Sequence, residues 1–131
     1  MAISENQTCI TVEATEDLSA AQYHFVYIHT DGKLKLSGED SNNIGVLQNK
    51  PTAGQAATVC IAGVTKLVCA GALAAGKAVG SHTNGKADAH DTSQVKTAVL
   101  LEASGGANEV VSAVFTGANG SIQDIVGVAA S

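Results

Sequence analysis

The sequence predicts an all-β fold with minor α content: a small β-barrel or sandwich built from two internally repeated β units, with one or two short helical turns and extended terminal segments. Three observations lead to this class. Short apolar segments are separated by Gly-containing turns, Asp31-Gly32 and Asn84-Gly85 are strong hairpin signals, and one half of the chain repeats the pattern of the other. The 131 residues suffice for one ordinary domain.

The internal repeat is the most informative feature of the chain. Residues 29–33 (HTDGK) recur 53 positions later as residues 82–86 (HTNGK). With one further residue inserted, residues 55–63 lie over residues 109–117 at an offset of 54. The predicted organisation is an N-terminal arm at 1–17, a β-domain at 18–117 with repeat copies at about 23–63 and 76–117, and a C-terminal tail at 118–131.

The individual strands follow from periodicity. Residues 23–28 (YHFVYI) alternate, with Tyr23, Phe25 and Tyr27 on one face. A type I′ turn at Asp31-Gly32 leads to a second alternating segment at residues 34–36, and Asn84-Gly85 predicts the same turn in the second copy. Further strands are predicted at residues 44–47, 57–62, 64–68, 97–101 and 110–115, which are short and often β-branched. Helical turns are expected near residues 17–22 and 70–75.

Composition and charge exclude several classes of function. The chain has 14 Gly, no Trp, two Tyr and two Phe, so its core is thin and an oligomer is favoured. A formal net charge of −5 argues against a nucleic-acid partner. The start of the sequence resembles no secretory signal, and no apolar run is long enough for a membrane helix, so no membrane partner is expected.

The segment GALAAGKA at residues 71–78 approaches a phosphate-binding loop. A working loop needs a following helix and a hydroxyl after the lysine, but position 78 is Ala and Gly80 follows closely. The repeat places Gly76-Lys77 over Tyr23-His24, at the start of a strand. We therefore expect a turn that leads into a strand, and no nucleotide cofactor.

The thiols and histidines give no catalytic or metal-binding set. Cys60 lies in an apolar strand and Cys69 ends the next one, so both are expected to be buried, whereas Cys9 could be exposed. Three cysteines leave one unpaired in any disulfide scheme and favour folding in a reducing cytosol. The cluster of His82, Asp88, His90 and Asp91 matches no established ligand spacing. No enzyme activity, metal or other cofactor is expected.

The candidate interface with another subunit or partner consists of apolar residues in three places. The aromatic face of Tyr23, Phe25 and Tyr27 lies over small residues in the second copy, so the rings either fill the core opposite those residues or contact another subunit. Apolar side chains also mark the arm and the tail, which are expected to dock on the domain or on a neighbour. These residues are Ile3, Ile10, Val12, Ile122, Ile125 and Val126.

Four segments resemble a known family of proteins. They are residues 59–64 (VCIAGV), 71–79 (GALAAGKAV), 84–86 (NGK) and 98–103 (AVLLEA), and in order and spacing they are similar to capsid decoration (cement) proteins of tailed phages, over roughly residues 20–117. The resemblance implies a non-enzymatic protein that binds the outside of the major capsid protein shell, most often as a homotrimer, and stabilises the phage head. It also implies folding in the host cytoplasm and a final place on the virion surface.

Two other classes of function remain as alternatives. A small ligand- or protein-binding β-barrel module would need a pocket, which a core rich in Gly and Ala leaves little room for. An enzyme would need convergent acid, base or nucleophile residues, and the sequence shows no such set.

Overall fold

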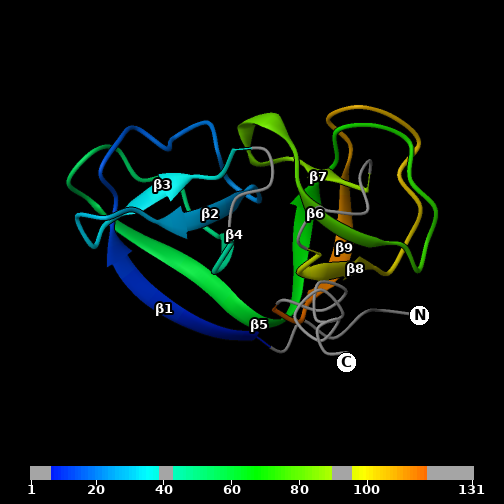
Figure 1. The fold of residues 1–131 in the computed structure, drawn as a ribbon, viewed down its shortest axis with the longest axis horizontal. Helices are drawn as coiled ribbons and strands as arrows, with labels where there is room; N and C mark the ends of the chain where they lie inside the picture. Colours follow the sequence, from blue (N-terminus) through cyan, green and yellow to red (C-terminus); the bar gives the residue numbers. More distant parts are fainter. Residues whose placement is uncertain (1–6, 39–42, 90–95, 118–131) are drawn as a thin grey trace, which may run out of the picture.

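The computed structural model describes residues 7–38, 43–89 and 96–117 (Figure 1). Within these residues, nine strands form one curled antiparallel sheet, which confirms the all-β class. The strands are β1 (Gln7–Glu13), β2 (Phe25–Ile28), β3 (Leu34–Leu36), β4 (Gly45–Leu47), β5 (Ala56–Val68), β6 (Ala78–Ser81), β7 (Ala87–Asp88), β8 (Ala98–Leu100) and β9 (Val110–Phe115).

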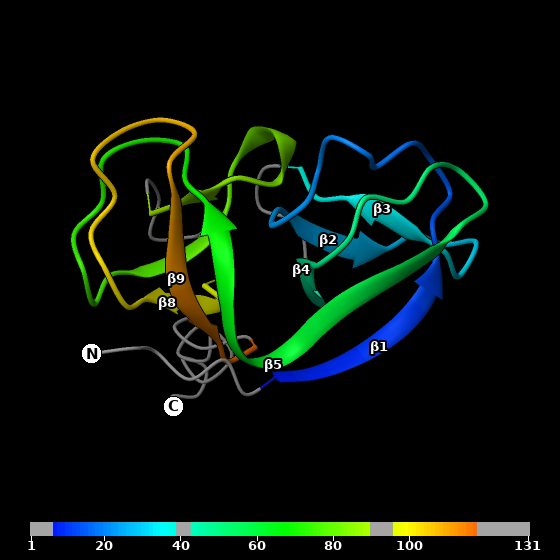
Figure 2. The ribbon, with the colours of Figure 1, turned by 180° about the vertical axis from the view of Figure 1, so that it is seen from behind.

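The sheet consists of two lobes that share one long strand. Its order is β3-β2-β4-β5-β9-β8-β6-β7, with β1 paired to the first half of β5. The first lobe comprises β1 to β4 and β5 up to Ala62, and the second comprises β5 from Gly63 onward and β6 to β9. Each lobe curls like half a barrel, and β5 bends between them (Figures 1 and 2).

The two lobes make the same backbone contacts at equivalent positions. Tyr23 N donates to Leu47 O at 2.7 Å, and Gly76 N donates to Leu100 O at 2.8 Å. Ala14 bridges to β3 in parallel orientation, as Cys69 does to β7. The equivalence therefore begins upstream of the predicted copies, because β1 corresponds to the second half of β5. Residues 7–13 of the predicted arm are thus a strand of the first lobe.

Gly63 continues a strand where the sequence predicted a turn. Residues 57–62 and 64–68 were expected as two strands, but β5 runs through both, with Gly63 at φ 104°. Glycine adopts positive φ without steric cost, so the strand bends here and keeps its pairing with Phe115 in β9. The bend lets one strand serve both lobes.

The two predicted hairpins are present. The positive φ at both central positions that a type I′ turn requires is found in the second turn but not in the first, and neither loop has only two residues. In each, the backbone closes over three residues: His29 N donates to Lys33 O, and His82 N donates to Lys86 O, both at 2.8 Å. In the first turn only Gly32 has positive φ, at 80°, which is typical of a three-residue loop. The second turn is a 3-10 turn at Thr83–Gly85, with positive φ at both Asn84 and Gly85.

The two segments predicted as helical turns are hydrogen-bonded turns without a helix. Ala21 N donates to Leu18 O at 3.0 Å in the first, and Lys77 N donates to Ala74 O at 3.3 Å in the second. The first segment continues into a further turn, in which His24 N donates to Ala21 O at 3.0 Å. This turn and the turn at residues 74–77 each have a residue with positive φ at their third position, Tyr23 or Gly76, just before the strand. That backbone reversal ends any helical run.

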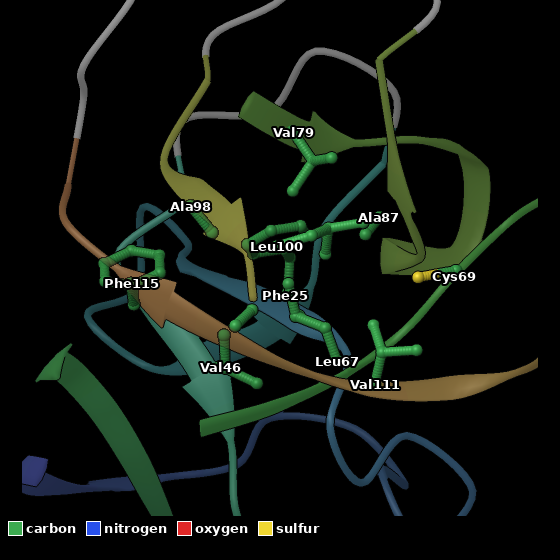
Figure 3. Close-up of a cluster of buried hydrophobic side chains, with 11 residues drawn as sticks. Phe25, Val46, Leu67, Cys69, Val79, Ala87, Ala98, Leu100, Val111 and Phe115 are labelled. Carbon is green, nitrogen blue, oxygen red and sulfur yellow. The ribbon is translucent and has the colours of Figure 1, made fainter. Parts of the chain in front are cut away.

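Each lobe has its own apolar core, and the first lobe contributes side chains to both. Val26, Leu47 and Val59 lie in the core of the first lobe. Their neighbours Phe25 and Val46 point the other way and belong to the core of the second lobe. Figure 3 shows these two side chains among those of the second lobe, and the Phe25 ring lies 6.3 Å from the Phe115 ring, tilted by 52°.

Polar contacts reinforce the packing of the lobes. Ser81 Oγ donates to Gly38 O at 2.8 Å, and Asn43 Nδ2 donates to Thr97 Oγ1 at 3.4 Å. Gly85 is packed so closely that a Cβ there would lie 2.7 Å from both Leu36 Cδ1 and Phe25 O. The two lobes are therefore fixed against each other by side chains and backbone alike.

Candidate interaction surface

The outer face of the second lobe carries the most exposed apolar side chains of its sheet. Val110 is 46% exposed and Leu101 is 40% exposed. Val64, Val99 and Val114 are half-buried on the same face. We call these five residues the outer apolar face.

Strand register places these residues side by side. Val114 in β9 pairs with Val99 in β8 and with Val64 in β5, so three valines form a row across three strands. The intervening residues Val111 and Ala113 point into the core of the second lobe. Because successive side chains of a strand alternate between faces, Val110 and Val114 share the outer face.

The equivalent face of the first lobe is used inside the molecule. Phe25, Val46 and Cys60 occupy positions equivalent to Ala78, Val99 and Val114, and all three are fully buried. Phe25 and Val46 pack against the second lobe. Among the described residues, no further lobe packs in that way against the outer apolar face, which leaves an apolar surface available to a partner.

One charged side chain, Glu102, contacts the strand that carries Val110 and Val114. Ser112 N donates to Glu102 Oε2 at 2.8 Å. That hydrogen bond, the Ser112 hydroxyl and the charge of Lys66 hold the pKa of Glu102 below its usual range. The carboxylate is therefore charged at neutral pH. Lys66 and Ser112 pair between the valines of β5 and β9 on the same face, so the outer apolar face also carries polar groups.

An open groove adjoins the outer apolar face between the lobes. It has a volume of about 380 Å³ and is lined by Ser19, Ala20, Gln22, Tyr23, His24, Lys50, Val68 and Val110. Burial lowers the pKa of His24, opposed by hydrogen bonds with the Gln22 and Ala21 backbone. Val110 belongs to both features, so the groove and the face form one continuous surface.

The aromatic face predicted from the sequence is divided between surface and core. Tyr23 lines the groove and Tyr27 is half-buried, with its ring edge-on to His29 at 6.2 Å between centroids. Phe25 is fully buried within the chain, so the prediction that it lies at a subunit interface is wrong. It fills the second core, which has few large side chains, as the alternative interpretation held.

The predicted arm residues lie on β1. Ile10 is 37% exposed, whereas Val12 is half-buried and packs against the core of the first lobe. Ile10 thus stays a candidate contact on the strand at the edge of the first lobe. The other four predicted interface residues fall outside the described residues. They are Ile3, Ile122, Ile125 and Val126.

The phosphate-loop-like segment, the cysteines and the histidine cluster occupy ordinary loop, core and surface positions of the fold. Residues 71–77 form a loop that bridges to Ser104 through Leu73 and ends in a turn. The next element is strand β6 instead of the helix that a phosphate-binding loop requires. Cys60 and Cys69 are buried and burial raises both thiol pKa values, whereas Cys9 is exposed, as the sequence predicted. His82 Nε2 lies 3.6 Å from Asp88 Oδ2, and His90 and Asp91 are outside the described residues.

Two other kinds of feature are absent from the described part of the chain. No group of three or more His, Cys, Asp or Glu side chains there could hold a metal ion. No helix in the same residues is long and apolar enough to cross a membrane.

Sequence reasoning missed the two most exposed members of the outer apolar face, Val110 and Leu101. Their signal was present in the repeat: Val110 stands where the first copy has Ala56, and Leu101 where it has Gln48. A change from a small or polar residue to a larger apolar one, at an outward position, marks a surface that differs between the copies.

Comparison with known proteins relates the fold to one solved structure in particular. The base of the head fibre protein gp8.5 of bacteriophage phi29 superimposes with a TM-score of 0.64 at 14% sequence identity, covering 85% of this chain and 95% of that one. The two proteins share a fold over almost the whole base. No protein-family model matches the chain, and no curated protein matches it by sequence.

Proposed function

We propose that this protein is a structural, non-enzymatic component of a phage head that binds the outer surface of the major capsid protein shell and stabilises it. The observation that carries the proposal is the fold shared with the head fibre base of a phage over 95% of that chain. The sequence resemblance to decoration proteins supports the same role independently. The proposed location is the virion surface, after folding in the host cytoplasm.

The outer apolar face is the proposed contact with the capsid. Val110 and Leu101 are nearly half exposed, so docking would remove much of both side chains from water. Burying the exposed part of such a side chain contributes about 1 kcal/mol. A gain of that size is small at one site, but an assembly bound at several points multiplies it through effective concentration.

The proposed assembly is a homo-oligomer, and a trimer agrees with the resemblance. The chain carries few large apolar side chains, and its net charge of −5 makes nucleic acid an unfavourable partner. Ile10 on β1 gives a second apolar contact point away from the outer apolar face. Sedimentation velocity of the purified protein tests the oligomeric state directly.

Cosedimentation with expanded heads tests the function. Heads assembled without the protein are mixed with wild type, with Val110→Asp or with Ala56→Asp. Ala56 is the exposed equivalent of Val110 in the first lobe, so the two variants add the same charge at matched positions. We expect Val110→Asp to weaken head binding at least about tenfold, which corresponds to roughly 1.4 kcal/mol, and Ala56→Asp to bind like wild type.

Two outcomes would contradict the proposal. The first is wild-type protein that fails to pellet with heads but binds DNA at physiological salt. The second is a Val110→Asp variant that binds heads like wild type while its fold stays intact by circular dichroism, which would remove the outer apolar face from the contact.

The groove beside Val110 favours a second candidate function, a small ligand- or protein-binding module. Its lining combines apolar Val68 and Val110 with polar His24 and Lys50. Native mass spectrometry of the purified protein distinguishes the two functions. A small molecule that copurifies and is lost in Lys50→Ala would favour the module, whereas binding to heads alone favours the capsid role.

A further inference from the structure

Two cysteines distant in sequence are direct neighbours across a pair of strands. Cys9 in β1 pairs with Cys60 in β5, and both thiols are free. Their side chains therefore lie on the same face of the sheet. Cys9 is exposed and Cys60 is fully buried, so only one of the two thiols is open to a reagent from solution.

The hydrogen-bond pattern shows which kind of pair this is. Ala14 N donates to Gln55 O at 2.9 Å, so these two residues form a hydrogen-bonded position at the end of the ladder. From there to Cys9 and Cys60 the register runs without a shift, since the irregularity lies beyond Cys9. Hydrogen-bonded and non-hydrogen-bonded pairs alternate along antiparallel strands, which makes Cys9–Cys60 a non-hydrogen-bonded pair.

The pairing of β5 with β4 also indicates that Cys9 and Cys60 form a non-hydrogen-bonded pair. Gln48 N donates to Thr58 O at 2.8 Å, which marks a hydrogen-bonded position between β4 and β5. Two residues along, Cys60 pairs with Val46 and directs its backbone groups toward β4. Those groups therefore point away from β1 and Cys9.

A non-hydrogen-bonded pair has the spacing that a disulfide needs. Its Cα atoms lie about 4.5 Å apart, within the range of roughly 4.4–6.8 Å found across disulfides. At present each thiol donates elsewhere: Cys9 Sγ to Gln7 Oε1 at 3.2 Å and Cys60 Sγ to Ala62 O at 3.3 Å. A disulfide between the two residues would replace these weak hydrogen bonds by a covalent bond, and a pair at this spacing can be bridged without backbone movement.

The second lobe has a residue pair at the equivalent position, so this cross-strand pairing is a feature of both repeats of the fold. Val64 and Val114 occupy the equivalent positions and pair across β5 and β9 in the same way. Only the first lobe carries thiols there. The third cysteine, Cys69, lies in the core of the second lobe and has no cysteine as a strand partner.

We propose that Cys9 and Cys60 form a disulfide that ties β1 to β5 when the folded protein meets a small-molecule disulfide such as oxidised glutathione. The Cys9 thiolate attacks one sulfur of the reagent, forms a mixed disulfide and releases one glutathione thiolate. The Cys60 thiolate then attacks the Cys9 sulfur and releases the second. Two thiol protons and two electrons pass from the protein to give two reduced glutathiones.

The bond would fasten the strand at the edge of the first lobe. β1 contacts the sheet through β5, and most of its side chains are exposed. A cross-link there closes a long loop in the unfolded chain and so stabilises the folded state. A released phage particle would meet an oxidising medium; that link rests on the proposed function, whereas the pairing rests on geometry alone.

Peptide mapping of the purified full chain tests the bond without any capsid. The protein is incubated with oxidised or reduced glutathione, quenched with acid, denatured and alkylated. Trypsin cuts after Lys33, Lys35, Lys66 and Lys77, so the three cysteines fall on separate peptides. We expect oxidised protein to lose two hydrogens in mass, to link the peptides of Cys9 and Cys60, and to leave Cys69 alkylated.

Two variants serve as controls. Cys69→Ser should still form the link. Cys60→Val, which carries the residue found at the equivalent Val114, should stop at a glutathione adduct on Cys9. Differential scanning calorimetry should show a rise in Tm of about 10 °C on oxidation of wild type and none for Cys60→Val.

The proposal is overturned by any of three results. These are a wild-type protein that keeps three alkylated cysteines, one that stops at the Cys9 adduct, and one that links Cys69 or a second chain instead. Head binding plays no part in these readouts, so their failure leaves the proposed capsid role untouched.

Discussion

The two lobes share one backbone plan but use its outer face differently. In the first lobe the face carries Phe25 and Val46, both fully buried against the second lobe. In the second lobe the equivalent positions hold Ala78 and Val99, both half-buried. A repeated unit can thus use the same face once for internal packing and once as a surface, and the side chains at equivalent positions determine which.

The largest expected effect comes from breaking the contact between the lobes. Phe25→Ala removes the aromatic side chain that packs 6.3 Å from Phe115 and leaves a cavity in the second core. We expect a loss of about 3–5 kcal/mol in the free energy of unfolding, measured by urea denaturation.

Ile28→Ala is the control for that variant, because Ile28 lies on the same strand with its side chain 38% exposed. The free energy of unfolding of Ile28→Ala should fall by no more than about 1 kcal/mol. Equal losses in the two variants would show that Phe25 does not hold the lobes together.

A smaller effect should come from making the first lobe resemble the second. Gly45 is the equivalent of Ala98, but a Cβ at position 45 would lie against the Cys60 carbonyl oxygen and 2.6 Å from Val59 Cγ1. Backbone atoms cannot yield cheaply, so Gly45→Ala should cost about 1–3 kcal/mol of stability.

Thermal unfolding of Gly45→Ala is best compared with that of Gly71→Ala, since a Cβ at position 71 meets nothing within 4 Å. The second variant should unfold near the wild-type temperature. If Gly45→Ala did so too, close packing of β4 on β5 would not distinguish the lobes.

The smallest effect concerns acid stability. Glu102 and Asn49 are equivalent, and each accepts a backbone N–H, from Ser112 and Thr58 respectively. The pKa of Glu102 is lowered in the folded protein, chiefly by that hydrogen bond, so its stabilising contribution is present above the unfolded pKa and lost as pH falls through the folded pKa.

Glu102→Gln keeps a neutral acceptor, as Asn49 does in the first lobe, and removes this pH dependence. Urea midpoints measured from about pH 6 down to pH 3 should fall less steeply for the variant than for wild type. Parallel curves would mean that the Ser112 contact contributes no pH-dependent stability.

Much of the fold could be predicted from local patterns. The HTDGK and HTNGK segments located two hairpins, and β-branched runs located most strands. The long β5 could not be predicted, because Gly63 reads as a turn until its pairing with Phe115 is known. The helical turns were mispredicted for a related reason, since backbone reversals at Tyr23 and Gly76 depend on the strands they enter.

The candidate surface was harder to predict than the fold. Alternation put Tyr23, Phe25 and Tyr27 on one side of a strand, but β2 begins at Phe25 and Tyr23 lies in the turn before it. Alternation also carries no information about which element covers that side. The second lobe buries Phe25, and that contact joins residues far apart in sequence. The outer apolar face was hidden for the converse reason, because valines of short strands look the same whether they face a core or a partner.

Cryo-electron microscopy of expanded heads, with and without bound protein, tests the central claim most directly. The account predicts added density on the outside of the shell, with the face of β8 and β9 that carries Leu101 and Val110 turned toward the major capsid protein. Density that is absent, or that lies inside the shell, would contradict it.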